Sequence, residues 1–203
     1  MMEKAEGNNF GEYEWIMDRL KDGTIDDWEW IAQMVPDFPC AYKWIMDRLK
    51  DGTVDDWELF AQMFSDFPCG LDDFIHRHWI TNAIDCGSLE AVKWMISKGV
   101  NLHFVDDEGY SPLHSCIDRT LPDKYEILQL LIDSGADINI GTELETQGTN
   151  GWTPLHMASV RNDIKAVKIL LDSGADCTLK TPIDDYATAE QEAAHRGNHE
   201  IEN

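Results

Sequence analysis

Positively charged residues are scarce in this sequence. Lys and Arg total 16 of 203 residues, whereas Asp and Glu total 39, which gives a formal net charge of −23. The acidity is spread along the chain, because residues 1–71 carry −10 and residues 72–203 carry −13. Proteins that bind nucleic-acid phosphates or anionic membranes need clustered Lys and Arg, so the sequence argues against both partners. The complement of such a chain is a basic protein.

Long apolar runs and paired cysteines are also missing. No window approaches the roughly 18 apolar residues of a transmembrane helix, and residues 1–9 lack the apolar core of a signal peptide. The cysteines are odd in number, widely spaced and form no C-x-x-C pair, so we expect buried, reduced thiols in a cytoplasmic protein. A structural zinc site is the alternative, but its ligand spacing is absent. The cysteines are Cys40, Cys69, Cys86, Cys116 and Cys177.

A tandem duplication occupies the N-terminal part of the chain. Segment 13–40 aligns with segment 42–69 at an offset of 29, and 22 of the 28 aligned positions are identical. Apolar residues make up 43% of the sequence and include 8 Trp, so there is enough material for a core. Four of the tryptophans recur at matched positions of the two copies, and we expect them to pack in the core or between hairpins: Trp15, Trp28, Trp44 and Trp57.

Each copy of the duplication predicts a helix, a tight turn and a second helix. Apolar residues recur with helical period up to Leu20, after which Gly23 is predicted to end the helix as a left-handed cap. Thr24 is then placed to cap the second helix, and the second copy repeats this plan with Thr53. A third and fainter start predicts a bridging helix over residues 71–78.

A different repeat follows the duplication. The motif S/T-P-L-H begins at Ser111 and at Thr153, and the motif D-S-G-A-D begins at Asp133 and at Asp172. These motifs closely resemble the ankyrin repeat, whose pattern is T-P-L-H-x-A in a unit of about 33 residues.

The spacing of three glycines tests this resemblance. Gly99, Gly135 and Gly174 lie 36 and 39 residues apart, so each interval exceeds the ankyrin period. The extra residues fall around Pro122 and within 139–151, where ankyrin units carry loops. The register of the repeat therefore survives both insertions.

The resemblance covers about 79–203 and implies an all-α fold. We expect an ankyrin-type helical solenoid with short β-hairpin or loop tips, extended N-terminally by two helical hairpins. The predicted organisation is a flexible N-terminus at 1–9, the tandem hairpins at 10–70 and ankyrin repeats at 71–203. About four repeats are expected, and the first and last are degenerate because the ends of a stack face water.

Catalytic motifs are missing from the sequence, and no cofactor is implied. It contains no G-x-S-x-G, H-E-x-x-H, G-x-G-x-x-G or phosphate-binding loop. The resemblance implies that His114 and His156 brace the turn that opens the first helix of a unit. An isolated histidine also needs a positioned partner to act as an acid or a base. His195 and His199 could form a metal pair four residues apart, but the ankyrin register explains them better.

Paired carboxylates offer a second route to chemistry. Asp26-Asp27 and Asp55-Asp56 could suggest hydrolysis, but both pairs follow a predicted N-cap threonine, where the helix dipole favours carboxylates. We therefore interpret them as capping residues. A metal-dependent hydrolase built from clustered acids and the His195/His199 pair is the alternative from another functional class.

Aromatic residues beside acidic loops are the candidate binding surface. Trp152 and Tyr110 occupy the variable position before the P-L-H motif, which in ankyrin proteins tends to face the concave side; the alternative is that they pack against the inserted loop. Aromatic anchors ringed by acids suit a basic partner. The predicted partner-binding residues are Asp106, Asp107, Glu108, Tyr110, Glu143, Glu145, Asn150, Trp152, Asp184, Asp185 and Tyr186.

These features predict a non-enzymatic protein-interaction module. Ankyrin stacks are recognition scaffolds as a family, so the expected partner is a basic protein, and inhibition is one form that such binding takes. Small acidic chains of this size also resemble immunity proteins and antitoxins that neutralise basic toxins or nucleases. A scaffold in a larger assembly is a further alternative. We expect the unbound chain to be a monomer.

Overall fold

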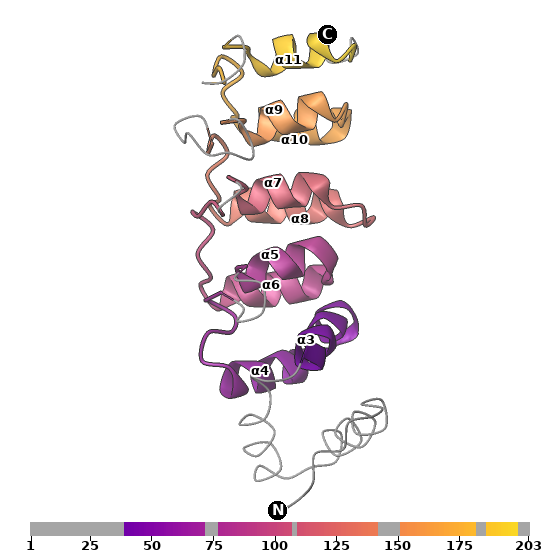
Figure 1. Cartoon of the computed structure of the whole chain (residues 1–203), viewed down its shortest axis with the longest axis vertical. Helices are drawn as coiled ribbons and strands as arrows, with labels where there is room; N and C mark the ends of the chain where they lie inside the picture. Colours follow the sequence, from indigo (N-terminus) through magenta and orange to yellow (C-terminus); the bar gives the residue numbers. More distant parts are fainter. Residues whose placement is uncertain (1–38, 72–76, 107–108, 142–150, 182–185, 199–203) are drawn as a thin grey trace, which may run out of the picture.

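The protein is described by a computed structural model over residues 39–71, 77–106, 109–141, 151–181 and 186–198. In this part of the chain, helices lie in antiparallel pairs that stack along one long axis (Figure 1). The helices are α3 (Pro39–Asp51), α4 (Val54–Met63), α5 (Trp79–Cys86), α6 (Leu89–Ser97), α7 (Pro112–Asp118), α8 (Lys124–Asp133), α9 (Pro154–Val160), α10 (Ile164–Asp172) and α11 (Ala189–His195).

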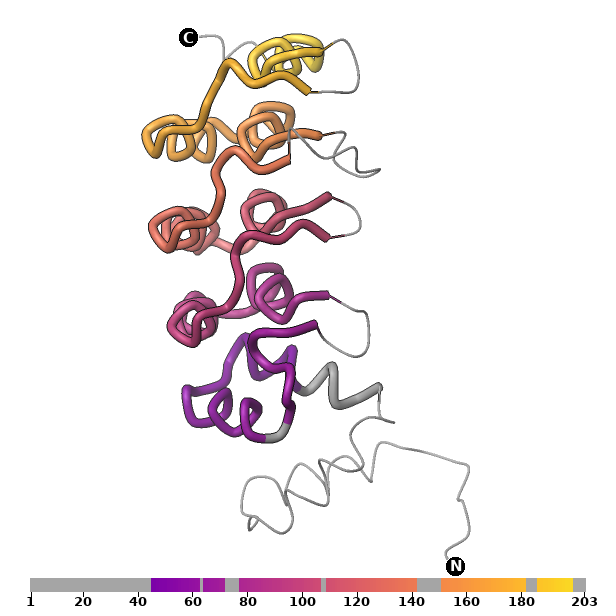
Figure 2. The backbone as a smooth tube through the Cα atoms, turned by 90° about the vertical axis from the view of Figure 1, so that its left-hand side faces the viewer, coloured from indigo at the N-terminus to yellow at the C-terminus, as the bar shows by residue number. Residues whose placement is uncertain are grey.

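Successive units stack helix upon helix. The first helices of the units, α5, α7, α9 and α11, form one column of neighbours, and α6, α8 and α10 form a second column (Figure 2). Leu113, Leu131, Leu155 and Leu170 are all buried between these columns and units. Outside the helices, the described residues contain two isolated β-bridges, and they form no extended β-strand. The predicted all-α, ankyrin-type fold is confirmed.

Capping boxes explain where the first helices of three units begin. The side chains of Ser111, Thr153 and Thr188 each accept a hydrogen bond from the backbone N–H three residues later. The side chain of that residue in turn accepts a hydrogen bond from the backbone N–H of the cap. Two backbone donors that have no partner within the helix are thereby satisfied. Proline follows Ser111 and Thr153, where its missing N–H costs nothing.

Left-handed glycines end the second helices of the units. Gly99, Gly135 and Gly174 have φ values of 78°, 91° and 93°, a region that other residues adopt only at a cost. A left-handed cap was also predicted for Gly23 of the duplication, and its counterpart in the second copy is Gly52. Gly23 lies outside the described residues, so its cap stays a prediction, and Gly52 does not have a positive φ. A Cβ at Gly52 would instead clash with the carbonyl oxygen of Arg48.

The second copy of the duplication stacks on the first ankyrin-like unit. Helix α3 lies against α5 and α4 lies against α6, so the α3–α4 hairpin continues both columns. Thr53 caps α4 in a capping box with Asp56, as predicted. Trp57 is buried, donates to the carbonyl oxygen of Arg48 and lies 5.9 Å from the Trp94 ring, which confirms its predicted core role.

The chain between α4 and α5 differs from the prediction. Leu71 and His78 pair in an isolated antiparallel bridge and α5 begins only at Trp79, so the predicted bridging helix is wrong at both of its ends. The bridge matches one between Lys180 and Thr188, which also precedes the first helix of a unit. Residues 13–38 of the first copy lie outside the described residues, whereas Pro39 and Cys40 begin α3, and the boundaries 1–9 and 10–70 stay predictions.

The four cysteines whose side chains the structure describes are free but not uniformly buried, and the side chain of Cys40 lies outside that description. Cys116 is buried, as expected, and Cys86 is half-buried. Cys69 and Cys177 are exposed, so the prediction of burial is wrong for both. Each lies in a turn outside the helices.

Candidate functional site

The candidate binding surface lies where the chain enters the first helix of each unit. The segments before α5, α7, α9 and α11 project from the same side of the stack (Figures 1 and 2). Backbone hydrogen bonds close three of them: Gly70 and Trp79 pair at 3.2 Å, Asp106 and Tyr110 at 2.9 Å, and Thr181 and Ala187 at 3.0 Å. These segments are called the hairpin edge below.

Asp106 and Tyr110 form the turn before α7. The Asp106 carboxylate accepts a hydrogen bond from the Tyr110 backbone N–H at 2.8 Å, and its carbonyl accepts one from Gly109 at 2.9 Å. Tyr110 is half-buried, and its ring meets the His114 ring edge to face at 6.0 Å. Asp106 therefore shapes the turn that presents the tyrosine, in addition to any contact with a partner.

Trp152 lies between two units. It is half-buried and packed against the core, and its carbonyl oxygen lies 2.9 Å from Nε2 of His114. Its indole Nε1 is buried without a hydrogen-bond partner among the described residues, and the Arg196 guanidinium lies 5.9 Å from the ring centroid. The indole thus combines an unused donor with an aromatic face that a cation already approaches.

Tyr186 is the most exposed of the large apolar side chains that the structure describes. Its relative exposure is 67%, and its φ of 51° places it in the left-handed region. It comes directly after the segment 182–185 and two residues before Thr188, which pairs with Lys180 in an isolated β-bridge. A tyrosine held in a turn with its ring in solvent is suited to contact a partner.

Seven of the predicted residues lie outside the described part of the chain, and their roles stay predictions. The four that are described, Asp106, Tyr110, Trp152 and Tyr186, all belong to the hairpin edge. The seven are Asp107, Glu108, Glu143, Glu145, Asn150, Asp184 and Asp185.

The two motif histidines are structural. The Ser111 N–H donates to Nδ1 of His114, so Nε2 carries the proton and donates to the Trp152 carbonyl oxygen of the next unit. Burial lowers the pKa of His114 to about 4 and also lowers the pKa of His156, which bridges to Ala187 at 3.2 Å. Both imidazoles are therefore neutral braces near pH 7, as the resemblance implied.

A set of turn-forming side chains that recurs along the hairpin edge was not predicted from the sequence. Asn101, Asp137 and Asp176 occupy the same position of three units, and each accepts a hydrogen bond from the backbone N–H two residues later at 2.9–3.0 Å. Asn139 also accepts from the backbone N–H of Asp176 at 2.9 Å, which ties adjacent units. The second aspartate of D-S-G-A-D signals this role, because Asx turns use such side chains.

No group of three or more His, Cys, Asp or Glu side chains in the described ranges is arranged to hold a metal ion. His199 of the predicted His195/His199 pair lies outside those ranges. No helix within the described ranges is long and apolar enough to cross a membrane.

Stacked helix pairs with capped first helices and a continuous core define a helical-repeat solenoid. Residues 69–142 match a family model described as ankyrin repeats (3 copies), and residues 150–182 match one described as ankyrin repeat. The two matches together span more than half of the chain. The chain therefore belongs to the ankyrin-repeat family, whose members are protein-interaction modules.

One relative shows the same likeness. The chain is similar to ankyrin repeat and SOCS box protein 16 of Homo sapiens, with 32% identity over 72 residues. The alignment covers 36% of this chain and 14% of the human protein. The similarity therefore concerns the repeats, and the chain spans a small part of that relative.

Proposed function

We propose that the protein is a non-enzymatic module that binds a basic protein through its hairpin edge. The observation that carries the proposal is the exposed Tyr186 ring at a turn that follows two consecutive aspartates in the sequence, Asp184 and Asp185. An aromatic anchor bordered by carboxylates binds cationic surfaces by apolar contact and by charge attraction.

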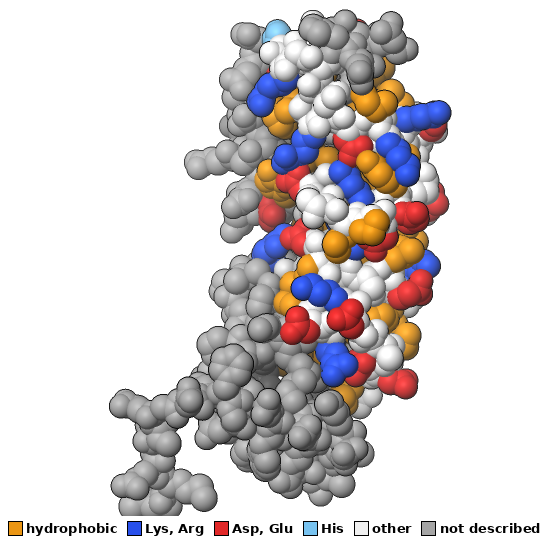
Figure 3. Space-filling view, turned by 90° about the vertical axis from the view of Figure 1, so that its right-hand side faces the viewer, with side chains coloured by type: hydrophobic (Ala, Val, Ile, Leu, Met, Phe, Trp, Pro, Cys, Tyr) orange, Lys and Arg blue, Asp and Glu red, His pale blue; other side chains and the backbone are white. Residues whose placement is uncertain are grey.

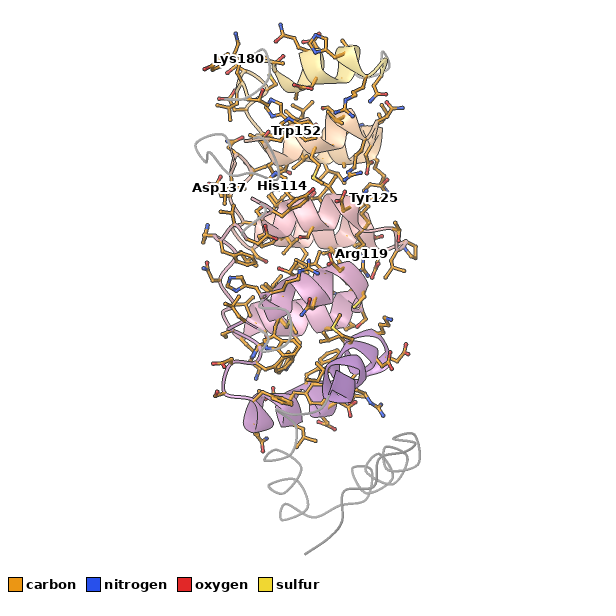
Figure 4. All side chains as sticks on the ribbon, viewed as in Figure 1. His114, Arg119, Tyr125, Asp137, Trp152 and Lys180 are labelled. Carbon is orange, nitrogen blue, oxygen red and sulfur yellow. The ribbon has the colours of Figure 1, made fainter. Side chains whose placement is uncertain are left out.

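The charge of the whole chain supports the same partner. With a net charge of −23, the protein attracts cationic molecules and speeds their encounter at low ionic strength. Along the hairpin edge, Asp137 and Asp176 are exposed, and their turn bonds leave further carboxylate lone pairs for a partner's Lys or Arg. Lys180 lies on the same side (Figure 4), so the edge is acidic but not uniformly so.

A binding titration tests the proposal. The probe is a fluorescent 15-residue peptide of Arg, Leu and Gly, compared with a peptide in which Gln replaces Arg. We expect Tyr186→Ala to weaken binding about tenfold and Asp184→Asn with Asp185→Asn to weaken it about threefold. Leu171→Ala truncates an apolar side chain of α10 that is 44% exposed, and it should leave binding unchanged. Equal binding of the neutral peptide, or of the Tyr186 variant, contradicts the proposal.

Inhibition of a basic toxin or nuclease is the narrower form of this hypothesis. The acidic surface and the small stacked domain would suit the role, since an inhibitor has to cover a cationic active site. A toxin gene beside this gene, and loss of toxin activity when the two proteins are mixed, would support it. If the basic partner keeps full activity in the complex, the scaffold role remains. Light scattering of the free protein tests the predicted monomer.

A further inference from the structure

A second surface lies at the opposite end of the helices from the hairpin edge. A cleft of about 700 Å³ opens between the α7–α8 loop and the junction of α9 with α10, and Arg196 after α11 completes its wall. Arg119 and Tyr125 of this wall are far from Asp137 and Lys180 of the hairpin edge (Figure 4). The cleft therefore draws side chains from three successive units.

The exposed charges of the cleft are mainly positive, unlike those of the chain. Arg161, Lys165 and Arg196 are exposed in its wall, whereas Asp118 is the one exposed carboxylate among its lining residues. In the upper half of Figure 3, Lys and Arg side chains lie on this face among Asp, Glu and apolar side chains. A local excess of cations in a chain of −23 needs an explanation other than composition.

Internal contacts fix the floor of the cleft and leave its cations accessible. Lys124 and Asp163 pair at 2.5 Å with side chains only 14% and 10% exposed, and the Tyr125 hydroxyl donates to Asp163 at 3.1 Å. Lys165 lies 4.0 Å above the Tyr125 ring. That contact holds the Lys165 ammonium at the cleft without neutralising it.

The Arg161 guanidinium also keeps donors for a ligand. Its Nε lies 2.5 Å from Asp118 across the unit boundary, and the two side chains are 49% and 36% exposed. The remaining N–H donors of a guanidinium lie on its Nη atoms, in the fork that matches a carboxylate. A second carboxylate could therefore join Arg161 without breaking its pair with Asp118.

We propose that this cleft binds an acidic peptide segment of a partner protein, with its carboxylates on Arg161, Lys165 and Arg196. The volume and the span of three units exceed what a single small anion would fill. A nucleic acid would extend beyond the cleft over a surface that is acidic overall, which its phosphates would avoid. A short segment with a few carboxylates stays within the local cationic region, because salt screens charges beyond roughly 8–10 Å.

Fluorescence polarisation with the full chain tests this proposal. The probe is a labelled 12-residue peptide with four Glu separated by Gly, and its matched control has Gln in place of Glu. The acidic peptide should bind, bind more weakly as salt rises, and lose about tenfold in affinity with the triple variant Arg161→Gln, Lys165→Gln and Arg196→Gln. Lys168→Gln, on the same helix but outside the cleft, should leave affinity unchanged.

Several results would overturn the proposal. These are no binding of the acidic peptide, equal binding of the Gln peptide, an unaffected triple variant, and tighter binding of an oligouridylate of equal charge. If the triple variant does not fold, Lys165→Gln alone should weaken binding about twofold. Tyr186→Ala should leave acidic-peptide binding intact, and Lys165→Gln should leave basic-peptide binding intact. These two variants test the cleft and the hairpin edge separately, although Arg196 of the cleft also approaches the Trp152 ring.

Discussion

The Nε2 atom of His114 lies 2.9 Å from the carbonyl oxygen of Trp152, so a side chain at the start of α7 joins the unit that begins with α9. The same imidazole accepts the Ser111 backbone N–H on Nδ1 at 3.1 Å. Both bonds require the neutral tautomer with its proton on Nε2. A second proton on Nδ1 would remove the acceptor for the Ser111 N–H, which is one of the two bonds of the capping box, and would bring a charge into the core.

Acid should therefore destabilise the repeats. Burial lowers the folded-state pKa of His114 to about 4 from an ordinary value of 6.5, so the unfolded chain binds more protons between these values. The stability from the neutral imidazole is fully present above pH 6.5 and is lost as pH falls toward 4. The loss is at most about 3 kcal/mol, measured as the free energy of unfolding in urea at several pH values.

His114→Gln separates this effect from other acid effects. Gln191 already accepts the cap N–H of Thr188 at 2.9 Å, so glutamine fits the same capping position. The variant should lose about 1 kcal/mol at pH 7 with the bond to Trp152. Between pH 6.5 and 4 it should lose clearly less stability than the original protein. Parallel stability curves for the two proteins would show that His114 is not the titrating group.

Arg119 is a second inter-unit tie, and its removal should be costly. Its side chain is 1% exposed and donates to the carbonyl oxygens of Ile84 and Gly87 at the end of α5, and to Asp123. Arg119→Met would leave two buried carbonyls without these donors. We expect a loss of about 2–4 kcal/mol in urea unfolding.

Arg161 provides the matched control for that measurement. It occupies the position of Arg119 in the next unit, but its pair with Asp118 is half-exposed. Arg161→Met should therefore cost less than about 1 kcal/mol. If both variants lose the same stability, the buried bonds of Arg119 contribute no more than a surface ion pair.

The contrast between these two arginines shows where sequence reasoning ends. The motifs at Ser111 and Thr153 predicted the capped first helices, because capping depends on neighbours three residues apart. From the sequence alone, Arg119 is an ordinary loop cation, because its partners at the end of α5 lie more than 30 residues away along the chain. Such a contact depends on how units stack, which a local pattern does not specify.

Of the two candidate surfaces, the sequence predicted the hairpin edge but not the cleft. Tyr110, Trp152 and Tyr186 could be placed on one edge because the ankyrin register fixes their position in the unit. Asn162 has a φ of 55° at the position that Gly197 occupies in the last unit, and no sequence motif predicted this left-handed asparagine. The cationic cleft near Asn162 arises only when three units are stacked.

The aromatic cluster around Phe67 should couple the α3–α4 hairpin to the repeats. The Phe67 ring meets Phe60 and Trp79 edge to face at 5.7 and 5.3 Å, and it stacks on Trp94 at 5.7 Å. Phe67→Ala should cost about 3–5 kcal/mol and expose the α4–α5 connection to protease. Limited proteolysis and urea unfolding followed by circular dichroism would measure both effects.

Val54→Ala is the control for the Phe67 variant. Val54 opens α4 but is 51% exposed, so its truncation should leave stability and cleavage nearly unchanged. A Phe67→Ala protein that unfolds in one transition with unaltered stability would contradict the coupling. Two transitions would show that the hairpin and the repeats have become separate folding units.

Cysteine reactivity should follow burial and thiol acidity. Cys69 and Cys177 are exposed, whereas Cys116 is buried and its thiol donates to the Lys124 carbonyl oxygen at 3.3 Å. Burial raises the pKa of the Cys116 thiol to about 12, so only about one molecule in ten thousand carries the reactive thiolate at pH 8. N-ethylmaleimide should modify the two exposed thiols within minutes and reach Cys116 only when urea opens the stack, as peptide mass spectrometry would show. Modification of Cys116 at the rate of Cys69 in the native protein would contradict its burial on α7, where it faces the start of α8.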